Sequence, residues 1–240
     1  MANEGDLLFD SGGTWRVYRH GRNLLYQFRP PLGDGAPARG VLIDEHRRRG
    51  RLFFRPPYDR RRGFALSYPL DELLFQHHFA RSGGLVVHAC GVAWRGRALA
   101  FCGPSGAGKS TTARLWLRHQ PDATILSDDR LVLRRHGEKW QAHGTPWHGS
   151  ARLASAHQRA LSAVFFLEHG PKTVLVKLDR AEAAARLLAV AFPPLWEREG
   201  VAATLRGAAR VAGALPAFVL RFQKDLSAVT TVRQVLGTLP

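Results

Sequence analysis

Hydrophobic and polar positions divide the chain near residue 69. Before it, short apolar alternations at 15–18, 24–28, 40–43 and 51–54 are separated by turns rich in Gly, Pro and Asn. An alternation with a period of two residues predicts β-strands. We therefore expect a small antiparallel β domain over residues 1–68 and a second domain over residues 69–240.

The second domain mixes helical and strand patterns, which predicts an α/β fold. Helices are expected over 71–81, 111–118, 181–190 and 196–212, and strands over 85–94, 97–102, 123–127, 131–134, 140–142, 162–168, 173–178 and 217–222. The first two of these strands are joined by Arg95-Gly96 and form a hairpin. That hairpin leads directly into a glycine-rich segment.

This segment, Gly103 to Ser110, reads G-x-x-x-x-G-K-S, the P-loop motif that binds phosphates through backbone amides. An apolar strand precedes it and a helix follows it, as the motif requires. Lys109 is expected to reach the β- and γ-phosphates of a nucleotide, and the Ser110 hydroxyl to bind Mg²⁺. The other residues expected to surround the phosphates are Gly103, Ser105, Gly106, Ala107, Gly108 and Thr111. The plain alternative is an ordinary glycine-rich turn.

Asp128 and Asp129 follow the predicted strand 123–127 and form the second strong signal. Because one helix and one turn separate this strand from the P-loop, we expect it to lie beside the P-loop strand, with both carboxylates at the same crevice. A carboxylate there could hold Mg²⁺ or accept a proton from an attacking hydroxyl, and two adjacent side chains could divide these roles. The alternative is a solvated turn.

Two further segments carry candidate residues. His88 lies in an apolar strand, where it could orient a catalytic aspartate or simply pack in the core. Residues 143–149 form a loop bounded by Gly and Pro, in which Thr145, Trp147 and His148 could line a pocket or stabilise a rigid turn. Arg152 follows this loop and could contact a transferred phosphate.

The net charge of +16 comes mostly from arginine, with dense clusters at 46–51 and 60–62. These clusters are either a solvated face or a docking site for an acidic protein or peptide. They lack interleaved aromatic residues, so we do not expect a nucleic-acid partner. Cys90 and Cys102 are predicted to be reduced and buried. Reduced thiols favour the cytoplasm. The sequence has no apolar run of membrane length and no recognisable signal peptide, so we expect no membrane partner.

Taken in order and spacing, four motifs resemble the HPr kinase/phosphorylase family and its shorter HPr kinase-related serine kinases. They are residues 87–92, 101–111, 126–129 and 144–149. The resemblance covers residues 69–240 and implies a P-loop kinase domain of the HPr kinase and phosphoenolpyruvate carboxykinase type. It also implies that Asp128 is the base, that His88 supports it, and that Ser110 and Asp129 bind Mg²⁺.

Three features depart from the bifunctional members of that family. Thr111 and Ser150 stand where acidic residues are common, and the segment linked to the phosphorylase reaction is absent. The phosphorylase reaction and HPr as a substrate are therefore not carried over. The layout is similar to kinases of peptide natural products, including those acting on lasso-peptide precursors.

We therefore expect an enzyme that uses ATP and Mg²⁺ to phosphorylate a serine of a peptide or small protein, docked on the basic β domain by strand addition. Homo-oligomers are compatible with the resemblance. The alternatives are a kinase of a sugar or another metabolite, and a nucleotide-gated binding module with little transfer activity.

Overall fold

The computed structural model describes residues 5–29, 36–44, 46, 48–56 and 64–238, which fold into two compact units. The first unit comprises Met1–Leu74 with Leu195–Arg198, and the second comprises Phe75–Pro194 with Glu199–Pro240. The division falls inside helix α1 (Leu70–Arg81), slightly beyond the domain boundary expected after residue 68. That domain boundary stays a prediction.

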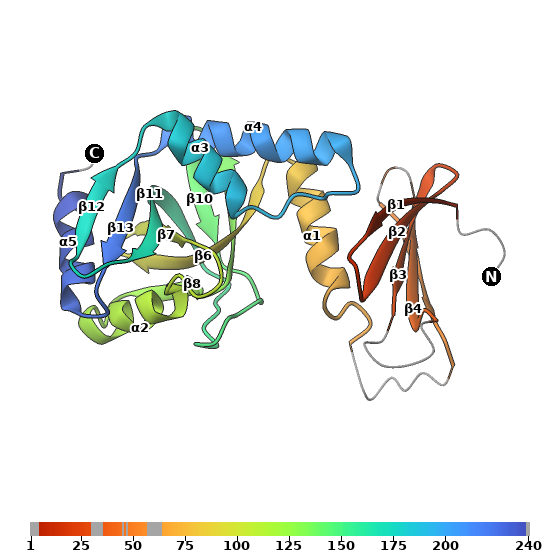
Figure 1. The fold of residues 1–240 in the computed structure, drawn as a ribbon, viewed down its shortest axis with the longest axis horizontal. Helices are drawn as coiled ribbons and strands as arrows, with labels where there is room; N and C mark the ends of the chain where they lie inside the picture. The colour runs from red at the N-terminus through yellow and green to blue at the C-terminus, as the bar shows by residue number, and fades with distance from the viewer. Residues whose placement is uncertain (1–4, 30–35, 45, 47, 57–63, 239–240) are drawn as a thin grey trace. The chain divides into compact units, whose positions relative to one another are not determined.

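Five strands form the sheet of the first unit, each antiparallel to its neighbours in the order β1-β2-β3-β4-β5 (Figure 1). They are β1 (Asp6–Asp10), β2 (Trp15–His20), β3 (Asn23–Phe28), β4 (Arg39–Ile43) and β5 (Gly50–Phe54). The predicted antiparallel sheet is therefore present. The sequence pattern predicts four of its strands and misses β1, whose three apolar residues between two aspartates are too few to show an alternation.

Trp196 belongs to the core of this first unit, although it is distant in sequence. The ring centroids of Trp15 and Tyr26 lie 5.7 and 5.6 Å from its own, both in edge-on contacts. The sequence pattern predicts a helix over 196–212, whereas helix α4 spans Arg198–Ala214. The predicted start is wrong because Trp196 packs among the strand side chains instead of beginning the helix.

The second unit is built on a mixed eight-stranded sheet in the order β10-β9-β6-β7-β11-β13-β12, with β8 paired to β6. Its elements are β6 (Leu85–Trp94), β7 (Arg97–Cys102), α2 (Lys109–His119), β8 (Thr124–Ser127), β9 (Arg130–His136), β10 (Lys139–His143), β11 (Gln158–His169), β12 (Val174–Lys177), α3 (Arg180–Ala189), α4, β13 (Ala217–Phe222) and α5 (Leu226–Leu236). Strands β7, β11 and β13 are parallel, so their carboxyl ends meet at one edge. The mixed α/β architecture agrees with the sequence pattern.

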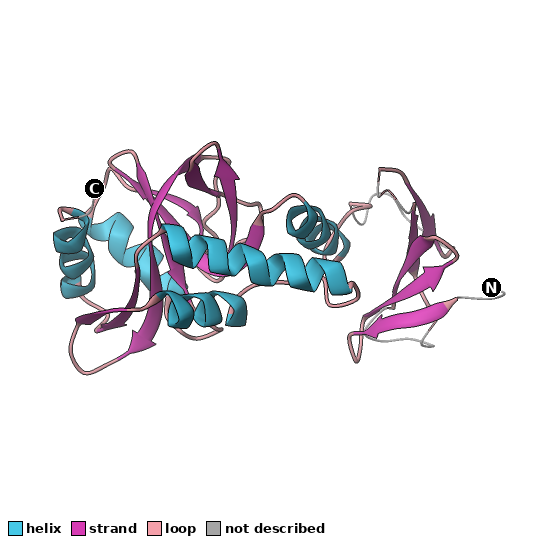
Figure 2. Ribbon diagram, turned by 90° about the horizontal axis from the view of Figure 1, so that it is seen from above, coloured by secondary structure: helices cyan, strands magenta, loops and turns pink. Residues whose placement is uncertain are grey.

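Helices cover both faces of this sheet (Figure 1). Along β7, Leu99 and Phe101 pack on the side of α2 and α5, whereas Ala98 and Ala100 pack on the side of α3 and α4. Figure 2 shows the long α4 helix lying across its face of the sheet. Helix α5 is absent from the sequence prediction, which assigns no helix or strand after the strand at 217–222.

The two cysteines are buried and free, as predicted. Burial raises the pKa of the Cys102 thiol to about 12 and raises that of Cys90 further, so both thiols stay protonated and unreactive. Of the arginine clusters, Arg48, Arg49 and Arg51 are exposed near β5. Residues 47 and 60–62 lie outside the described residues. None of the described helices has the length and hydropathy needed to cross a bilayer.

Candidate active site

The glycine-rich loop (residues 103–108) connects β7 to α2, which confirms the predicted strand–loop–helix arrangement. Gly106 and Gly108 have φ of +83° and +104°, a backbone conformation that glycine adopts without strain. A Cβ atom on Gly103 would lie 2.6 Å from the Cβ of Ala107, and one on Gly108 would lie 2.8 Å from the ring of Phe222. Glycine is therefore required at Gly103 by space, at Gly106 by dihedral angle, and at Gly108 by both.

The start of α2 is arranged to receive an anion. Helices α3 and α5 are capped by the carboxylates of Asp179 and Asp225, which accept backbone N–H groups of their first turns. Helix α2 has no side-chain cap and no acidic residue in its first turn, and it begins with Lys109. Its first amides are left without a partner from a side chain, at the positive end of the helix dipole. A phosphate group is the typical ligand of such a helix end.

Lys109 lies inside this loop and is only 6% exposed. Its Nζ donates hydrogen bonds to the carbonyl oxygens of Gly103, at 2.9 Å, and Pro104, at 2.8 Å. Burial lowers the pKa of its ammonium group, although the nearby Asp129 carboxylate opposes this effect. Of the other predicted phosphate-binding residues, Ser105 is exposed on the loop, Ala107 is buried, and Thr111 is half-buried in the first turn of α2.

Asp128 follows β8 and is 1% exposed. Its carboxylate accepts the Ser110 hydroxyl at 2.7 Å and the backbone N–H groups of Gly149, Ala151 and Leu153 at 2.8, 2.9 and 3.2 Å. Burial alone would raise the pKa of Asp128, but these hydrogen bonds outweigh burial and lower it. The carboxylate is thus held ionised and fixed beside the first turn of α2.

Asp129 has a different environment. One carboxylate oxygen contacts Nε2 of His88 at 3.0 Å, and the other accepts a hydrogen bond from Arg130. Its side chain is 22% exposed. Burial would raise the pKa of Asp129, but His88, Arg130 and Lys109 lower it below the ordinary value. Asp129 is therefore an ionised carboxylate that remains accessible from outside.

The structure corrects the expected pairing of His88 with Asp128. In the ladder between β6 and β9, His88 is directly opposite Arg130, which places its ring beside Asp129. Asp128 points the other way, toward Ser110. Strand β8 also does not neighbour the P-loop strand as expected, because β6 lies between β7 and β8. The two carboxylates still reach the loop region, one through Ser110 and the other near Lys109.

Residues 143–149 contact the strand ends that carry both aspartates. Thr145 donates its hydroxyl to the carbonyl of Arg130 at 2.6 Å, and Ser127 donates to the carbonyl of Trp147 at 2.8 Å. The Trp147 ring meets Phe75 edge-on, with centroids 5.1 Å apart. His148 and Arg152 are exposed, and Arg152 has φ of +55°. This loop therefore positions backbone groups around Asp128, while the Trp147 ring packs on α1.

Two residues near the site were missed by sequence reasoning. Arg130 contacts Asp129, and its guanidinium carbon lies 4.5 Å from the centroid of the Phe192 ring. His169 at the end of β11 hydrogen-bonds the carbonyl of Gly106 at 2.9 Å. Arg130 could not be singled out from the sequence, because arginine is abundant throughout the chain. His169 lies near the glycine-rich loop because β11 pairs with β7, and this strand order cannot be predicted from the sequence.

Gly149 gives a direct test of the contacts around Asp128. A Cβ atom at this position would lie 2.9 Å from Oδ2 of Asp128 and 3.3 Å from Oγ of Ser110. We expect Gly149→Ala to lower the free energy of unfolding by about 1–3 kcal/mol, measured by urea denaturation. Gly213→Ala is the matched control, because a Cβ there meets nothing within 4 Å. Equal stability of the two variants would contradict this close packing of Gly149 against Asp128 and Ser110.

Comparison with known proteins places the chain in a family. A family model described as SynChlorMet cassette protein ScmC matches residues 72–224, which is more than half of the chain. No curated protein matches. Among solved structures, the chain is similar to the HPr(Ser) kinase/phosphatase from Coxiella burnetii at 10% identity and a TM-score of 0.35, covering 63% of this chain and 98% of that chain. A similarity this distant carries no argument about the site. The ScmC match includes the glycine-rich loop, His88 and both aspartates, and the chain therefore belongs to the ScmC family.

Proposed function

We propose that this protein is a kinase that uses Mg²⁺ and ATP to phosphorylate a serine hydroxyl of a peptide or small protein. One observation carries the proposal. Beside a glycine-rich loop and an uncapped helix start lie two ionised carboxylates, one bonded to the Ser110 hydroxyl and the other to a histidine. Phosphoryl transfer needs these parts: a phosphate cradle, a metal ligand and a group that receives the hydroxyl proton.

The residues present fit a magnesium nucleotide. Mg²⁺ prefers oxygen ligands and is commonly held by one or two protein groups together with phosphates and water. Within the described ranges there is no cluster of three or more His, Cys, Asp or Glu suited to a metal held by protein alone. The Ser110 hydroxyl would hold the ion, and the Asp128 carboxylate, bonded to that hydroxyl, would orient it; the ion when bound would neutralise phosphate charge. Asp128 therefore serves the metal site, where the sequence resemblance implies Asp129.

Asp129 is the proposed base. Its side chain is 22% exposed, whereas Asp128 is 1% exposed and its carboxylate already accepts four hydrogen bonds. In the reaction, the serine oxygen forms a bond to the γ-phosphorus and the bond to the leaving oxygen breaks. The serine proton passes to Asp129. His88 and Arg130 fix the direction of that carboxylate, and Lys109 stabilises charge on the phosphates.

The acceptor class is proposed from charge and from a strand that has no neighbour on one side among the described residues. Strand β5 is the last strand of its sheet, and Arg51 and Phe53 on it are exposed. An acidic extended peptide could add to such an edge, as a precursor of a ribosomally made peptide such as a lasso peptide would. A second candidate is a metabolite kinase, which is favoured by a cavity of about 210 Å³ between α1 and residues 143–146.

A transfer assay tests the proposal. The protein is incubated with γ-³²P-ATP and Mg²⁺ together with acidic serine peptides or a panel of sugars. Label on a peptide serine is expected, and label on a sugar would instead establish the metabolite kinase.

Lys109→Ala should weaken ATP binding by about tenfold or more, measured by calorimetry, because it removes the buried cation from the loop. The exposed Lys139→Ala serves as control. ATP binding that is unchanged by Lys109→Ala would refute the assigned nucleotide site.

A further inference from the structure

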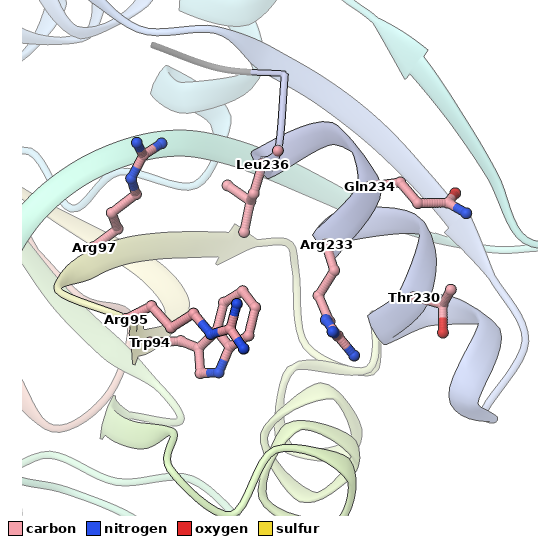
Figure 3. Close-up of a pocket in the computed structure, with 8 residues that line it drawn as sticks. Trp94, Arg95, Arg97, Thr230, Arg233, Gln234 and Leu236 are labelled. Atoms are coloured by element: carbon pink, nitrogen blue, oxygen red, sulfur yellow. The ribbon is translucent and has the colours of Figure 1, made fainter.

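A cavity lined by arginine side chains lies away from the candidate active site. It has a volume of about 420 Å³ and is formed by the β6–β7 turn and the end of α5 (Figure 3). Trp94, Arg95, Arg97, Thr230, Arg233 and Gln234 line it. Strand β7 begins at this cavity and ends at the glycine-rich loop, which separates the two sites by about 17 Å along the strand.

Trp94 is the fixed centre of this cavity. Its side chain is held by a hydrogen bond from Nε1 to the Asp122 carboxylate at 3.0 Å and by an edge-on contact with Trp116 at 5.6 Å. The guanidinium carbons of Arg95 and Arg233 lie 4.5 and 5.4 Å from the centroid of its rings. Two arginines from different elements are thus positioned against the same aromatic side chain, as Figure 3 shows.

The lining is rich in hydrogen-bond donors, and none of the described residues that form it carries a carboxylate. Neither Arg95 nor Arg233 forms an ion pair with any residue in the described part of the chain. The carboxylate of Asp122, which lies nearby, is bonded to the Trp94 indole. The guanidinium groups of Arg95 and Arg233 therefore lie beside a space large enough for a small molecule, which Arg97, Thr230 and Gln234 also line (Figure 3). Guanidinium groups bind carboxylates and phosphates in paired hydrogen bonds.

The backbone at Arg95 gives an independent observation. Arg95 and Gly96 form the two-residue turn of the hairpin, with φ of +47° and +77°. Turns with two positive φ angles favour Asn or Gly at both positions, and arginine is poorly suited to the first. The turn therefore holds a guanidinium at this cavity at some cost in local stability, a pattern that is typical of functional positions.

We propose that this cavity is a binding site for a small, multiply charged oxyanion carrying carboxylate or phosphate groups, separate from the nucleotide site. The anion is held by Arg95 and Arg233, with Arg97, Thr230 and Gln234 as further donors. This assignment does not depend on the proposed kinase activity, because no residue of the cavity belongs to the candidate active site.

The indole N–H signal of Trp94 in an NMR spectrum of the full-length protein reports on this cavity and is assigned by its loss in Trp94→Phe. Citrate and pyrophosphate are titrated at constant ionic strength, and amides of the glycine-rich loop report separately on the nucleotide site. We expect a saturable shift of the Trp94 signal. Saturation by both probes indicates general oxyanion recognition, and saturation by pyrophosphate alone indicates phosphate recognition.

Two variants and a control make the test specific. Arg233→Gln and Arg95→Asn should each weaken the affinity by about tenfold. Arg95→Asn should unfold at the same or a higher temperature than the natural protein, because Asn-Gly suits this turn. Arg210→Gln removes one charge from an exposed position on α4 and should change the affinity by less than about twofold. No saturable shift, or equal weakening in all three variants, would overturn the proposal.

Discussion

Replacing Asp129 by asparagine is expected to lower kcat for phosphoryl transfer by a factor of about 10² to 10⁴, which is the usual contribution of a positioned proton acceptor. Asparagine keeps the size of the side chain and can still accept a hydrogen bond from His88 or Arg130, but it cannot take up the serine proton. The Kd for the magnesium nucleotide should change by only a few-fold, because Asp129 is not bonded to Ser110. Single-turnover transfer and equilibrium binding measure the two effects separately.

The matched control is Asp179→Asn. It removes one carboxylate at the start of α3, where asparagine caps a helix as well as aspartate does. Its activity should remain close to that of the natural protein. The base assignment fails if Asp129→Asn keeps near-normal kcat, and it moves to Asp128 if Asp128→Asn loses kcat without any change in the metal requirement.

The sequence predicts the elements around the glycine-rich loop well, because local signals determine them. The spacing of Gly103, Gly106 and Gly108, the apolar strand before them and the helix after them are all local. The same holds for the two aspartates at the end of a short apolar strand. That these segments gather at one site follows from the general behaviour of strand ends in α/β sheets.

Which aspartate contacts His88 and which contacts Ser110 could not be predicted from the sequence. Alternation says that Asp128 and Asp129 point in different directions, but it does not say which of them points toward His88. The answer depends on the register that places His88 opposite Arg130, a pairing between residues far apart in the chain. The three amides that bind Asp128 come from the loop after residue 148, whose path the sequence leaves open.

Long-range packing also explains the errors in the predicted elements. Trp196 lies before the start of α4, and not in a helix as predicted, because its ring is buried against aromatic side chains of the first unit. Helix α5 is missed although Asp225 is a good cap, because it follows a strand closely and its apolar side chains are buried only by packing with α2 in the core. In both cases tertiary contacts between distant segments decide the local structure.

The second large effect is expected for Asp128→Asn, which should disturb both the metal requirement and the stability of the fold. Each oxygen of the carboxylate accepts two hydrogen bonds: Oδ1 from the amides of Gly149 and Leu153, and Oδ2 from Ser110 and the amide of Ala151. In either orientation of the substituted side chain, its NH₂ group faces at least one backbone N–H and leaves that donor without a partner. We expect a loss of about 1–3 kcal/mol in the free energy of unfolding.

Stability is measured by urea denaturation in the presence of EDTA, so that only the hydrogen bonds of Asp128 contribute to the difference. The metal role is measured separately, as the Mg²⁺ concentration that gives half-maximal transfer, which should rise by about tenfold or more in Asp128→Asn. Ser110→Ala should raise the same concentration, whereas Ser110→Thr keeps a hydroxyl on the metal side and should restore transfer. The two roles can then be told apart. A stable Asp128→Asn variant would contradict the hydrogen-bond geometry. An unchanged Mg²⁺ requirement together with an unchanged kcat would leave Asp128 a structural residue that only orders the loop after Trp147.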